Sequence, residues 1–237
     1  MSKPFDIVFF DMGHTLAFFY PSVGEIAAQA WTEVGLPTTA DQAGMAVRQV
    51  WKEEDENASI NGYPATQEYD EQAEYERSLK VMHLLGGSGE TMVRAYLKRV
   101  NQLFVEPNAI QLFDDVLPAL DHLQSAGYRL GIISNWSWNL IDRCKQVGID
   151  GYFEVIMASA YAGVSKPHPR IFQLTLEQAG VSPDQAVHVG DLYHADIVGA
   201  RAANMTGVLL DRKGESEKTD CPVVQDLWGL IDWLNSR

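Results

Sequence analysis

Residue types that could do chemistry follow the apolar runs of this 237-residue chain. Asp11 comes directly after the first run, and the groups that follow later runs are Ser134, Asn135, Lys166, Asp191 and Asp196. Carboxylates can act as nucleophiles or hold a hard cation, and a lysine can neutralise the charge that builds up when two anions meet. If the runs are strands of one parallel sheet, these groups converge on the rim where ligands bind in open α/β sheets. The sequence therefore predicts a charged site for a small ligand.

The apolar runs and the stretches between them predict the elements that would position these groups. Short apolar runs predict strands at 5–10, 129–133, 153–158, 186–189 and 207–210. Helix-favouring stretches follow or separate them at 115–126, 137–147, 168–179, 194–203 and 224–235. Strands that alternate with helices favour an α/β fold, here a Rossmann-like parallel sheet with helices on both faces.

Residues from about 20 to 107 have a different character. They are acidic and helix-favouring, and they predict helices at roughly 22–35, 41–56, 66–85 and 89–104. Because the first strand must join the sheet from before this block, we expect the block to be an inserted all-helical cap. The expected core comprises residues 1–17 and 108–237, and the expected cap comprises residues 18–107.

The composition restricts the classes of function. A net charge of −14 and a pI near 4.7 argue against a nucleic-acid partner, because such binding depends on Lys and Arg that neutralise phosphates. No window approaches about 18 uninterrupted apolar residues, so we expect no membrane partner. The two cysteines, Cys144 and Cys221, have no metal-ligand spacing. Together with the absence of a signal-like segment at the N-terminus, they favour a cytoplasmic protein. Monomer and homodimer both stay open.

Four short motifs resemble those of the haloacid dehalogenase-like hydrolase superfamily. The stretches that carry the resemblance are Asp11-Met12-Gly13-His14-Thr15-Leu16, Ser134-Asn135, Lys166-Pro167, and Gly190-Asp191 together with Asp196. They occur in the order of the family's four motifs, and the helical block lies where the family carries a helical cap.

The resemblance implies a phosphatase that acts on a small phosphorylated metabolite. Asp11 would attack phosphorus and form an aspartyl-phosphate, which divides hydrolysis into two easier displacements. Lys166 and Ser134 would be the other catalytic groups, because they would stabilise the charge on the phosphoryl oxygens. The phosphate-binding groups implied are Ser134, Asn135, Lys166, Thr15 and His14.

The resemblance also implies a Mg²⁺ ion, a hard cation that prefers oxygen ligands. The ligands would be the Asp11 carboxylate, the Gly13 backbone carbonyl and the Asp191 carboxylate. Asp196 would either hydrogen-bond around the metal shell or orient Lys166.

The sequence departs from the family's phosphatases at Gly13. These enzymes carry a second aspartate there, which protonates the leaving group and then activates water. A backbone carbonyl can still bind the metal, but acid–base catalysis, worth ~10²–10⁴ in rate, is lost at this position. Three hypotheses follow: His14 or a cap Glu or Tyr supplies the proton, the substrate has a good leaving group, or the protein is a weakly active phosphoryl-ligand binding protein.

A 2-haloacid dehalogenase-type hydrolase is the other enzymatic alternative. A halide needs no proton, so those enzymes also lack the second aspartate, but they need no metal. Because Asp191 and Asp196 keep the metal-type fourth motif, we favour the phosphatase. The motif set also resembles a branch of the superfamily that lacks the second aspartate and is described only as hydrolase-like.

Several neighbouring residues have simpler structural interpretations. His168 is expected to cap a helix, and His14 to be a loop residue. Trp136 and Trp138 fit an aromatic wall for the leaving group and burial under the cap about equally well. The acidic runs at 53–56 and 68–76 are expected to be solvated helix faces.

Overall fold

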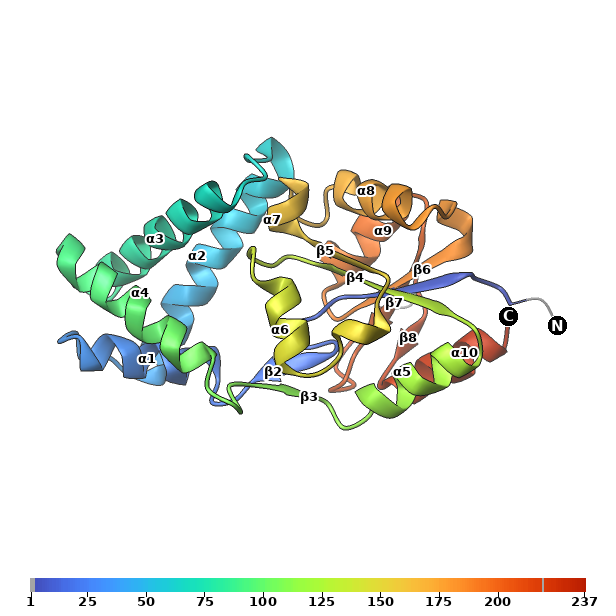
Figure 1. Cartoon of the computed structure of the whole chain (residues 1–237), viewed down its shortest axis with the longest axis horizontal. Helices are drawn as coiled ribbons and strands as arrows, with labels where there is room; N and C mark the ends of the chain where they lie inside the picture. Colours follow the sequence, from blue (N-terminus) through green and yellow to red (C-terminus); the bar gives the residue numbers. More distant parts are fainter. Residues whose placement is uncertain (1–2, 219) are drawn as a thin grey trace.

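The computed structural model describes residues 3–218 and 220–237, and a six-stranded parallel sheet lies at its centre (Figure 1). The order of the strands is β5-β4-β1-β6-β7-β8. The strands are β1 (Ile7–Phe10), β4 (Arg129–Ser134), β5 (Val155–Ala158), β6 (Ala186–Gly190), β7 (Thr206–Leu210) and β8 (Val223–Val224). Each adjacent pair runs parallel. The chain proceeds from β1 to β4 and β5 on one side and later to β6, β7 and β8 on the other. β1 therefore lies at the topological switch point, where ligands bind in such sheets.

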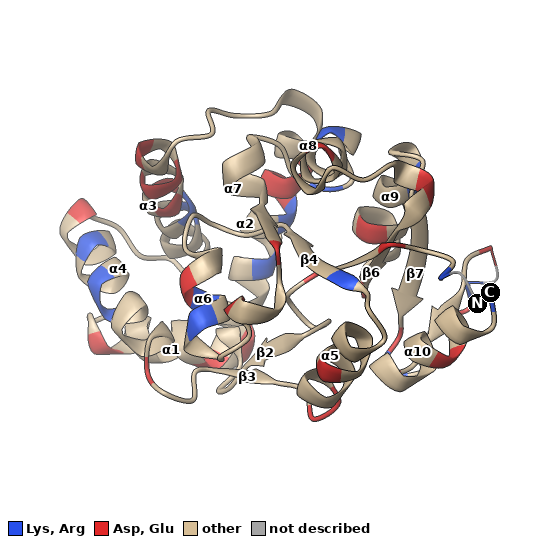
Figure 2. Ribbon diagram, turned by 45° about the vertical axis from the view of Figure 1, so that its right-hand side comes forward, with Lys and Arg blue, Asp and Glu red and all other residues tan. Residues whose placement is uncertain are grey.

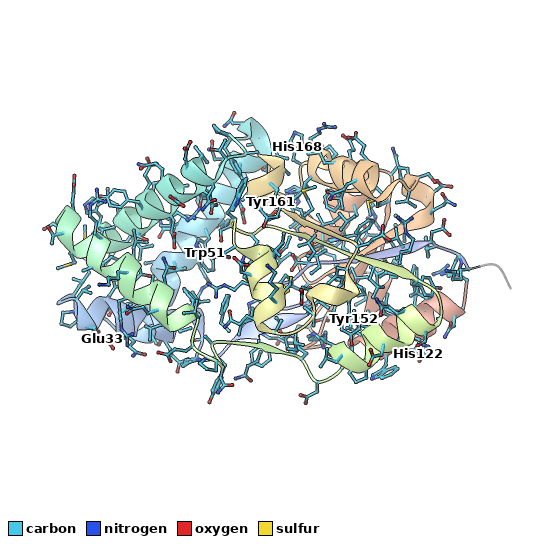
Figure 3. The ribbon with its side chains drawn as sticks, viewed as in Figure 1. Glu33, Trp51, His122, Tyr152, Tyr161 and His168 are labelled. Carbon is cyan, nitrogen blue, oxygen red and sulfur yellow. The ribbon has the colours of Figure 1, made fainter. Side chains whose placement is uncertain are left out.

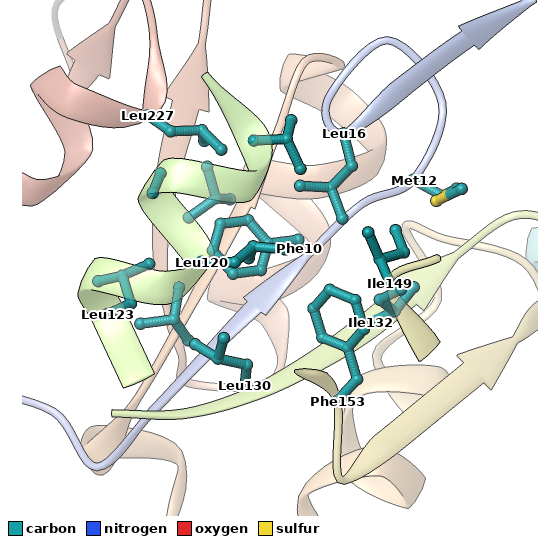
Figure 4. Close-up of a cluster of buried hydrophobic side chains, with 14 of the residues drawn as sticks. Phe10, Met12, Leu16, Leu120, Leu123, Leu130, Ile132, Ile149, Phe153 and Leu227 are labelled. Carbon is teal, nitrogen blue, oxygen red and sulfur yellow. The ribbon is translucent and has the colours of Figure 1, made fainter. Parts of the chain in front are cut away.

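The two faces of the sheet are covered by different helices. Side chains alternate along a strand, so Val8 and Phe10 of β1 join one cluster while Ile7 and Phe9 join another. The first cluster, drawn in Figure 4, packs β1 and β4 against helices on one face, α5 (Val116–Ser125), α6 (Leu140–Gln146) and α10 (Leu227–Asn235). On the other face lie α8 (Pro169–Ala179) and α9 (Gly199–Ala202). The predicted Rossmann-like α/β core with helices on both faces is confirmed.

The five predicted strands are present, and their ends move by at most two residues. β8 was not predicted. Val224 lies within the stretch expected to form a helix at 224–235, and Val223 directly precedes that stretch. That helix, α10, begins at Leu227, after Asp226 caps its first turn by accepting from the Gly229 N–H at 2.7 Å. The predicted helix 194–203 begins as a π-helical turn, Tyr193–Val198, before α9.

Four helices between β2 (Ala17–Phe19) and β3 (Ile110–Leu112) form what we call the helical unit: α1 (Val23–Glu33), α2 (Ala40–Asn61), α3 (Gln67–Leu84) and α4 (Glu90–Phe104). It has its own core, in which the rings of Trp31 and Tyr96 stack. Capping boxes start α1 and α2, at Ser22 and Thr39. In Figure 1 the unit stands beside the sheet, at the end where α7 (Ser159–Ala162) lies.

Helix α2 is longer than predicted, which places its C-terminal end against the core. The sequence predicted a helix at roughly 41–56, followed by a break that contains Gly62 and Pro64. In the structure α2 continues to Asn61 and ends at Gly62, whose φ of 65° suits glycine. Ala58 in this extension is only 2% exposed, so tertiary packing stabilises the added turn.

A two-stranded antiparallel ribbon lies where the chain enters and leaves the helical unit. Its strands, β2 (Ala17–Phe19) and β3 (Ile110–Leu112), were not predicted, because three residues give too short a pattern.

In the view of Figure 2, Asp and Glu gather along α3, whereas Lys and Arg are spread over several elements. No helix formed by residues 3–218 or 220–237 combines the length and apolar character that crossing a membrane requires.

Candidate active site

Asp11 follows β1 at the centre of the sheet's carboxyl edge. Its backbone N–H donates to the Val189 carbonyl at 2.8 Å, which ties it to β6. The Ser134 hydroxyl donates to Asp11 Oδ1 at 2.9 Å, and the Lys166 ammonium donates to the same oxygen at 2.7 Å. The hydrogen bonds among residues 3–218 and 220–237 leave Oδ2 without a donor. One oxygen is therefore held and the other can face a ligand.

Lys166 is 3% exposed, yet it is held as a cation. Its ammonium donates to Asp11 Oδ1 at 2.7 Å, to Asp196 Oδ1 at 2.6 Å and to the Ile133 carbonyl at 3.0 Å. Burial alone would lower the pKa of Lys166, but the two carboxylates outweigh it and raise that pKa above its ordinary value. The side chain therefore delivers a fixed positive charge beside the Asp11 carboxylate.

Asp196 orients this lysine. Its Oδ1 accepts from Lys166 and contacts His188 Nε2 at 2.9 Å, and its Oδ2 accepts from the Leu192 N–H at 2.9 Å. Burial would raise the pKa of Asp196, but Lys166 and His188 hold it below its ordinary value. Because both oxygens already accept from donors, the geometry favours the second of the two expected roles, orientation of Lys166, over the first, a hydrogen bond around the metal shell.

Gly190 and His188 both pack against the Asp196 carboxylate, and each residue type suits that position. A Cβ at Gly190 would lie 2.1 Å from Asp196 Cγ, so only glycine admits the carboxylate there. His188 is fully buried, and burial lowers its pKa, so the ring is a neutral partner of Asp196. His188 was not predicted, although a lone polar residue inside the apolar run 186–189 was a usable signal.

An ionised Asp191 would add negative charge that the lysine does not balance. It is half-buried, and burial, followed by the charges of Asp11 and Asp196, raises its pKa to about 8. A divalent cation would relieve this repulsion, and the Asp11 and Asp191 carboxylates with the Gly13 carbonyl are the oxygen donors that Mg²⁺ prefers. Within residues 3–218 and 220–237 no group of three or more His, Cys, Asp or Glu side chains could hold a metal. The expected set needs only two such side chains, so the donor chemistry fits Mg²⁺.

The loop after Asp11 is held in place by Arg212. The Arg212 guanidinium donates to the Thr15 carbonyl at 2.8 Å and pairs with Asp115 at 3.0 Å. Thr15 is fully buried, and its hydroxyl has no hydrogen-bond partner among the described residues. His14 is exposed and has a φ of 56°, so its side chain is not fixed toward Asp11. The loop interpretation of His14 therefore fits the structure.

The Asn135 side chain hydrogen-bonds to the backbone of Lys166. Its Oδ1 accepts from the Lys166 N–H at 2.7 Å, and its Nδ2 donates to the Lys166 carbonyl at 3.2 Å. The amide thus clamps the backbone of Lys166. Only the Asn135 backbone N–H is left for the phosphate contact implied by the resemblance.

The two tryptophans and His168 have structural partners. Trp136 stacks on Phe19, with ring centroids 5.8 Å apart, and its Cζ3 atom would lie 3.7 Å from a Cβ at Gly13. Trp138 packs edge-on against Tyr161 of α7. His168, labelled with Tyr161 in Figure 3, accepts from the Arg170 N–H at 3.1 Å. The predicted helix cap is confirmed, and Trp136 lies beside the position where an aspartate is missing.

The helical unit reaches the site through residues that were not predicted. The Tyr63 N–H donates to the Gly163 carbonyl at 2.7 Å, and the Trp138 N–H donates to Asp70 Oδ2 at 2.9 Å. Asp55 lies beside Ser165 and Asn135. Its neighbours Glu53 and Glu56 are exposed as expected, whereas burial raises the pKa of Asp55. The solvated-face prediction is therefore wrong at Asp55, which points to the core.

Comparisons with known proteins agree with this geometry. Residues 5–204 match the haloacid dehalogenase-like hydrolase family. A glyceraldehyde 3-phosphate phosphatase of Methanothermobacter thermautotrophicus is 28% identical over 242 residues, covering 96% of this chain and 98% of the relative. Haloacid dehalogenase-like hydrolase domain-containing protein 3 of Danio rerio is 30% identical, covering 100% and 98%. Among solved structures, a HAD-hydrolase of Bacillus subtilis, YfnB, bound to magnesium, gives a TM-score of 0.77 at 19% identity and covers 98% and 100%. The chain therefore belongs to the haloacid dehalogenase-like hydrolases.

Proposed function

We propose that this hydrolase is a Mg²⁺-dependent phosphatase that acts on a small phosphorylated metabolite through an aspartyl-phosphate on Asp11. The observation that carries the proposal is the state of the Asp11 carboxylate. Ser134 and Lys166 hold its Oδ1, so Oδ2 is the oxygen that can attack. The curated relative named as a glyceraldehyde 3-phosphate phosphatase supports a phosphate ester as the substrate class.

The residues around Asp11 divide the work of the first displacement. Asp11 Oδ2 forms a bond to phosphorus as the bond from phosphorus to the ester oxygen breaks. Lys166 and Ser134 place positive charge and a donor beside the phosphoryl oxygens, where they stabilise charge without reorganising. Asp196 holds Lys166 in that position. Water then attacks phosphorus and releases Asp11.

The metal would be held by Asp11, Asp191 and the Gly13 carbonyl. When bound, Mg²⁺ supplies the charge neutralisation that allows two anions to approach each other. The surplus charge at Asp191 and the magnesium bound to the Bacillus subtilis structure support this assignment. The same surplus charge favours a phosphatase over a dehalogenase, whose chemistry needs no cation.

We further propose that residues 18–107 act as the cap and that residues 1–17 and 108–237 form the catalytic core. The cap would exclude water and supply the specificity contacts. The protein would work in the cytoplasm, as a monomer or homodimer, without nucleic-acid or membrane partners. The net charge of −14 supports the exclusion of nucleic acid.

The test compares wild type with Asp11→Asn on a panel of phosphorylated metabolites, p-nitrophenyl phosphate and 2-haloacids, with Mg²⁺ and with EDTA. Asp184→Asn is the matched control, since Asp184 is exposed and precedes β6 at the opposite edge of the sheet. We expect phosphatase activity that needs Mg²⁺, is lost in Asp11→Asn and persists in Asp184→Asn. Full activity of Asp11→Asn would refute the nucleophile. Haloacid turnover that EDTA does not affect would favour the dehalogenase alternative, and phosphate binding without turnover would favour the binding protein.

A further inference from the structure

One face of α2 is directed at the segment that carries Lys166. Asp55, Ala58 and Gly62 recur at i, i+3 and i+7, so they lie along one side of the helix. At the end of this face a Cβ on Gly62 would lie 3.0 Å from the Gly163 carbonyl oxygen. The Tyr63 N–H donates to that same carbonyl at 2.7 Å. This face of α2 therefore packs on the chain just before Lys166.

Asp55 meets the core on this face. Its carboxyl group lies beside Ser165, which is 2% exposed, and beside Asn135, the clamp on the Lys166 backbone. Asn135 belongs to the second motif and Ser165 directly precedes the third, and these two motifs supply implied phosphate-binding groups. A carboxyl group from the helical unit thus lies beside residues that flank Lys166 and the Ser134 loop.

Other groups near the site are poorer proton donors. His14 is exposed, and its side chain makes no hydrogen bond within residues 3–218 and 220–237, while the His168 ring caps α8. The Tyr63 hydroxyl lies near Ser165, but burial raises the pKa of Tyr63 to about 12. Asp70 is occupied as an acceptor from the Trp138 N–H. Within the helical unit, Asp55 is the carboxyl group that combines proximity to Ser165 and Asn135 with a pKa raised by burial, which keeps it protonated to a higher pH.

We propose that Asp55 is the acid and base that replaces the missing carboxylate at Gly13, an assignment that rests on the proposed phosphatase function. As the Asp11–phosphorus bond forms and the ester bond breaks, Asp55 gives its proton to the leaving oxygen, which departs as an alcohol. The resulting carboxylate then takes a proton from water as the water oxygen bonds to phosphorus and the Asp11–phosphorus bond breaks. Inorganic phosphate leaves, and both aspartates return to their starting states. A hydrolase that lacks the core acid can in this way act on alkyl phosphates.

The test uses leaving groups that differ in their need for a proton. In Asp55→Asn, we expect kcat for an alkyl phosphate to fall by ~10²–10⁴-fold, the usual contribution of acid–base catalysis. With p-nitrophenyl phosphate, whose leaving group needs no proton, a rapid burst of nitrophenolate should remain within a few-fold of the wild-type rate. Steady-state turnover after the burst should slow, because the base for water is missing.

Two matched variants separate this role from docking of the helical unit. Asp70→Asn removes another contact between the helical unit and the core, and Glu56→Gln removes an exposed neighbour on α2. Both should lower activity on the two substrates by the same factor or not at all.

A pH profile adds a measurement that a loss of docking between the helical unit and the core would not change. The wild-type rate with alkyl phosphate should fall on the alkaline side as Asp55 ionises, and Asp55→Asn should lack this limb. The pH at which this limb falls also depends on the ionisable groups that interact electrostatically with Asp55, which are Glu54, Tyr63 and Lys166.

The inference and the proposed function fail in different ways. Wild-type kcat for the alkyl phosphate in Asp55→Asn, or an equal loss of the alkyl phosphate rate and the nitrophenolate burst, overturns the role of Asp55 alone. Absence of any Asp11-dependent phosphatase activity in wild type overturns the proposed function and this inference with it.

Discussion

The two sides of the site hold their charges in different ways. On the core side, Asp11, Lys166 and Asp196 are almost completely buried, and Lys166 alone donates three hydrogen bonds. On the side of the helical unit, Asp55 is only half-buried and comes from a helix on which Glu53 and Glu56 are exposed. The side chains on the core side are therefore held in place by the core itself. The positions of the side chains from the helical unit depend on how that unit packs against the core. Variants on the two sides should differ in what they change: stability and all chemistry for the core, and leaving-group or substrate dependence for the helical unit.

The largest effect is expected from Lys166→Met. Removal of the ammonium leaves Asp11 and Asp196 buried without their cation, which should cost about 3–5 kcal/mol in the free energy of unfolding. It should also lower kcat by at least ~10²-fold for every phosphate ester, since a fixed charge beside the phosphoryl group is lost. Urea denaturation and steady-state kinetics measure the two effects. Lys145→Met is the control, because that side chain is 58% exposed. A stability loss no larger than that of the control would mean that the core side is not the rigid region.

An intermediate effect is expected from Gly13→Asp. A Cβ at residue 13 meets only Trp136, at 3.7 Å, so the added side chain fits beside Asp11. In the Asp55→Asn background it should restore alkyl phosphate turnover by at least about tenfold, because it supplies an acid from the core. In wild type it should change this rate little. Gly13→Asn is the control that adds the shape without the proton. A gain of ~10²–10⁴ in wild type would show that no acid was present before.

The fold and most of the core side of the site could be predicted because Asp11, Ser134 and Asp191 each lie at or just after the end of an apolar strand. Asp11, Ser134 and Asp191 are tied to their places by the run that precedes them. The short elements β2, β3 and β8 could not be predicted, since two or three residues carry no usable periodicity. Asp55 lies in the acidic run 53–56, and only the packing of α2 distinguishes it from the solvated Glu53 and Glu56. Its role depends on tertiary contacts that no local pattern encodes.

The smallest effect is expected from Asp70→Asn. It weakens one charge-assisted hydrogen bond between the helical unit and the Trp138 N–H, worth about 1.5 kcal/mol. If that contact favours the arrangement that binds substrate, KM should rise by roughly tenfold with kcat nearly unchanged. Initial rates over a range of substrate concentrations measure this split. A fall in kcat that depends on the leaving group would instead place Asp70 in the chemistry and weaken the contrast with Asp55.

Trapping the intermediate tests the central claim most directly. Wild type and Asp55→Asn would be mixed with stoichiometric p-nitrophenyl phosphate and Mg²⁺, quenched rapidly in acid, digested, and mapped by peptide mass spectrometry. The account predicts one phosphoryl group on the peptide that contains Asp11, and a longer-lived signal in Asp55→Asn because water lacks its base. Release of nitrophenolate with no phosphoryl group on Asp11 at any time point would contradict it.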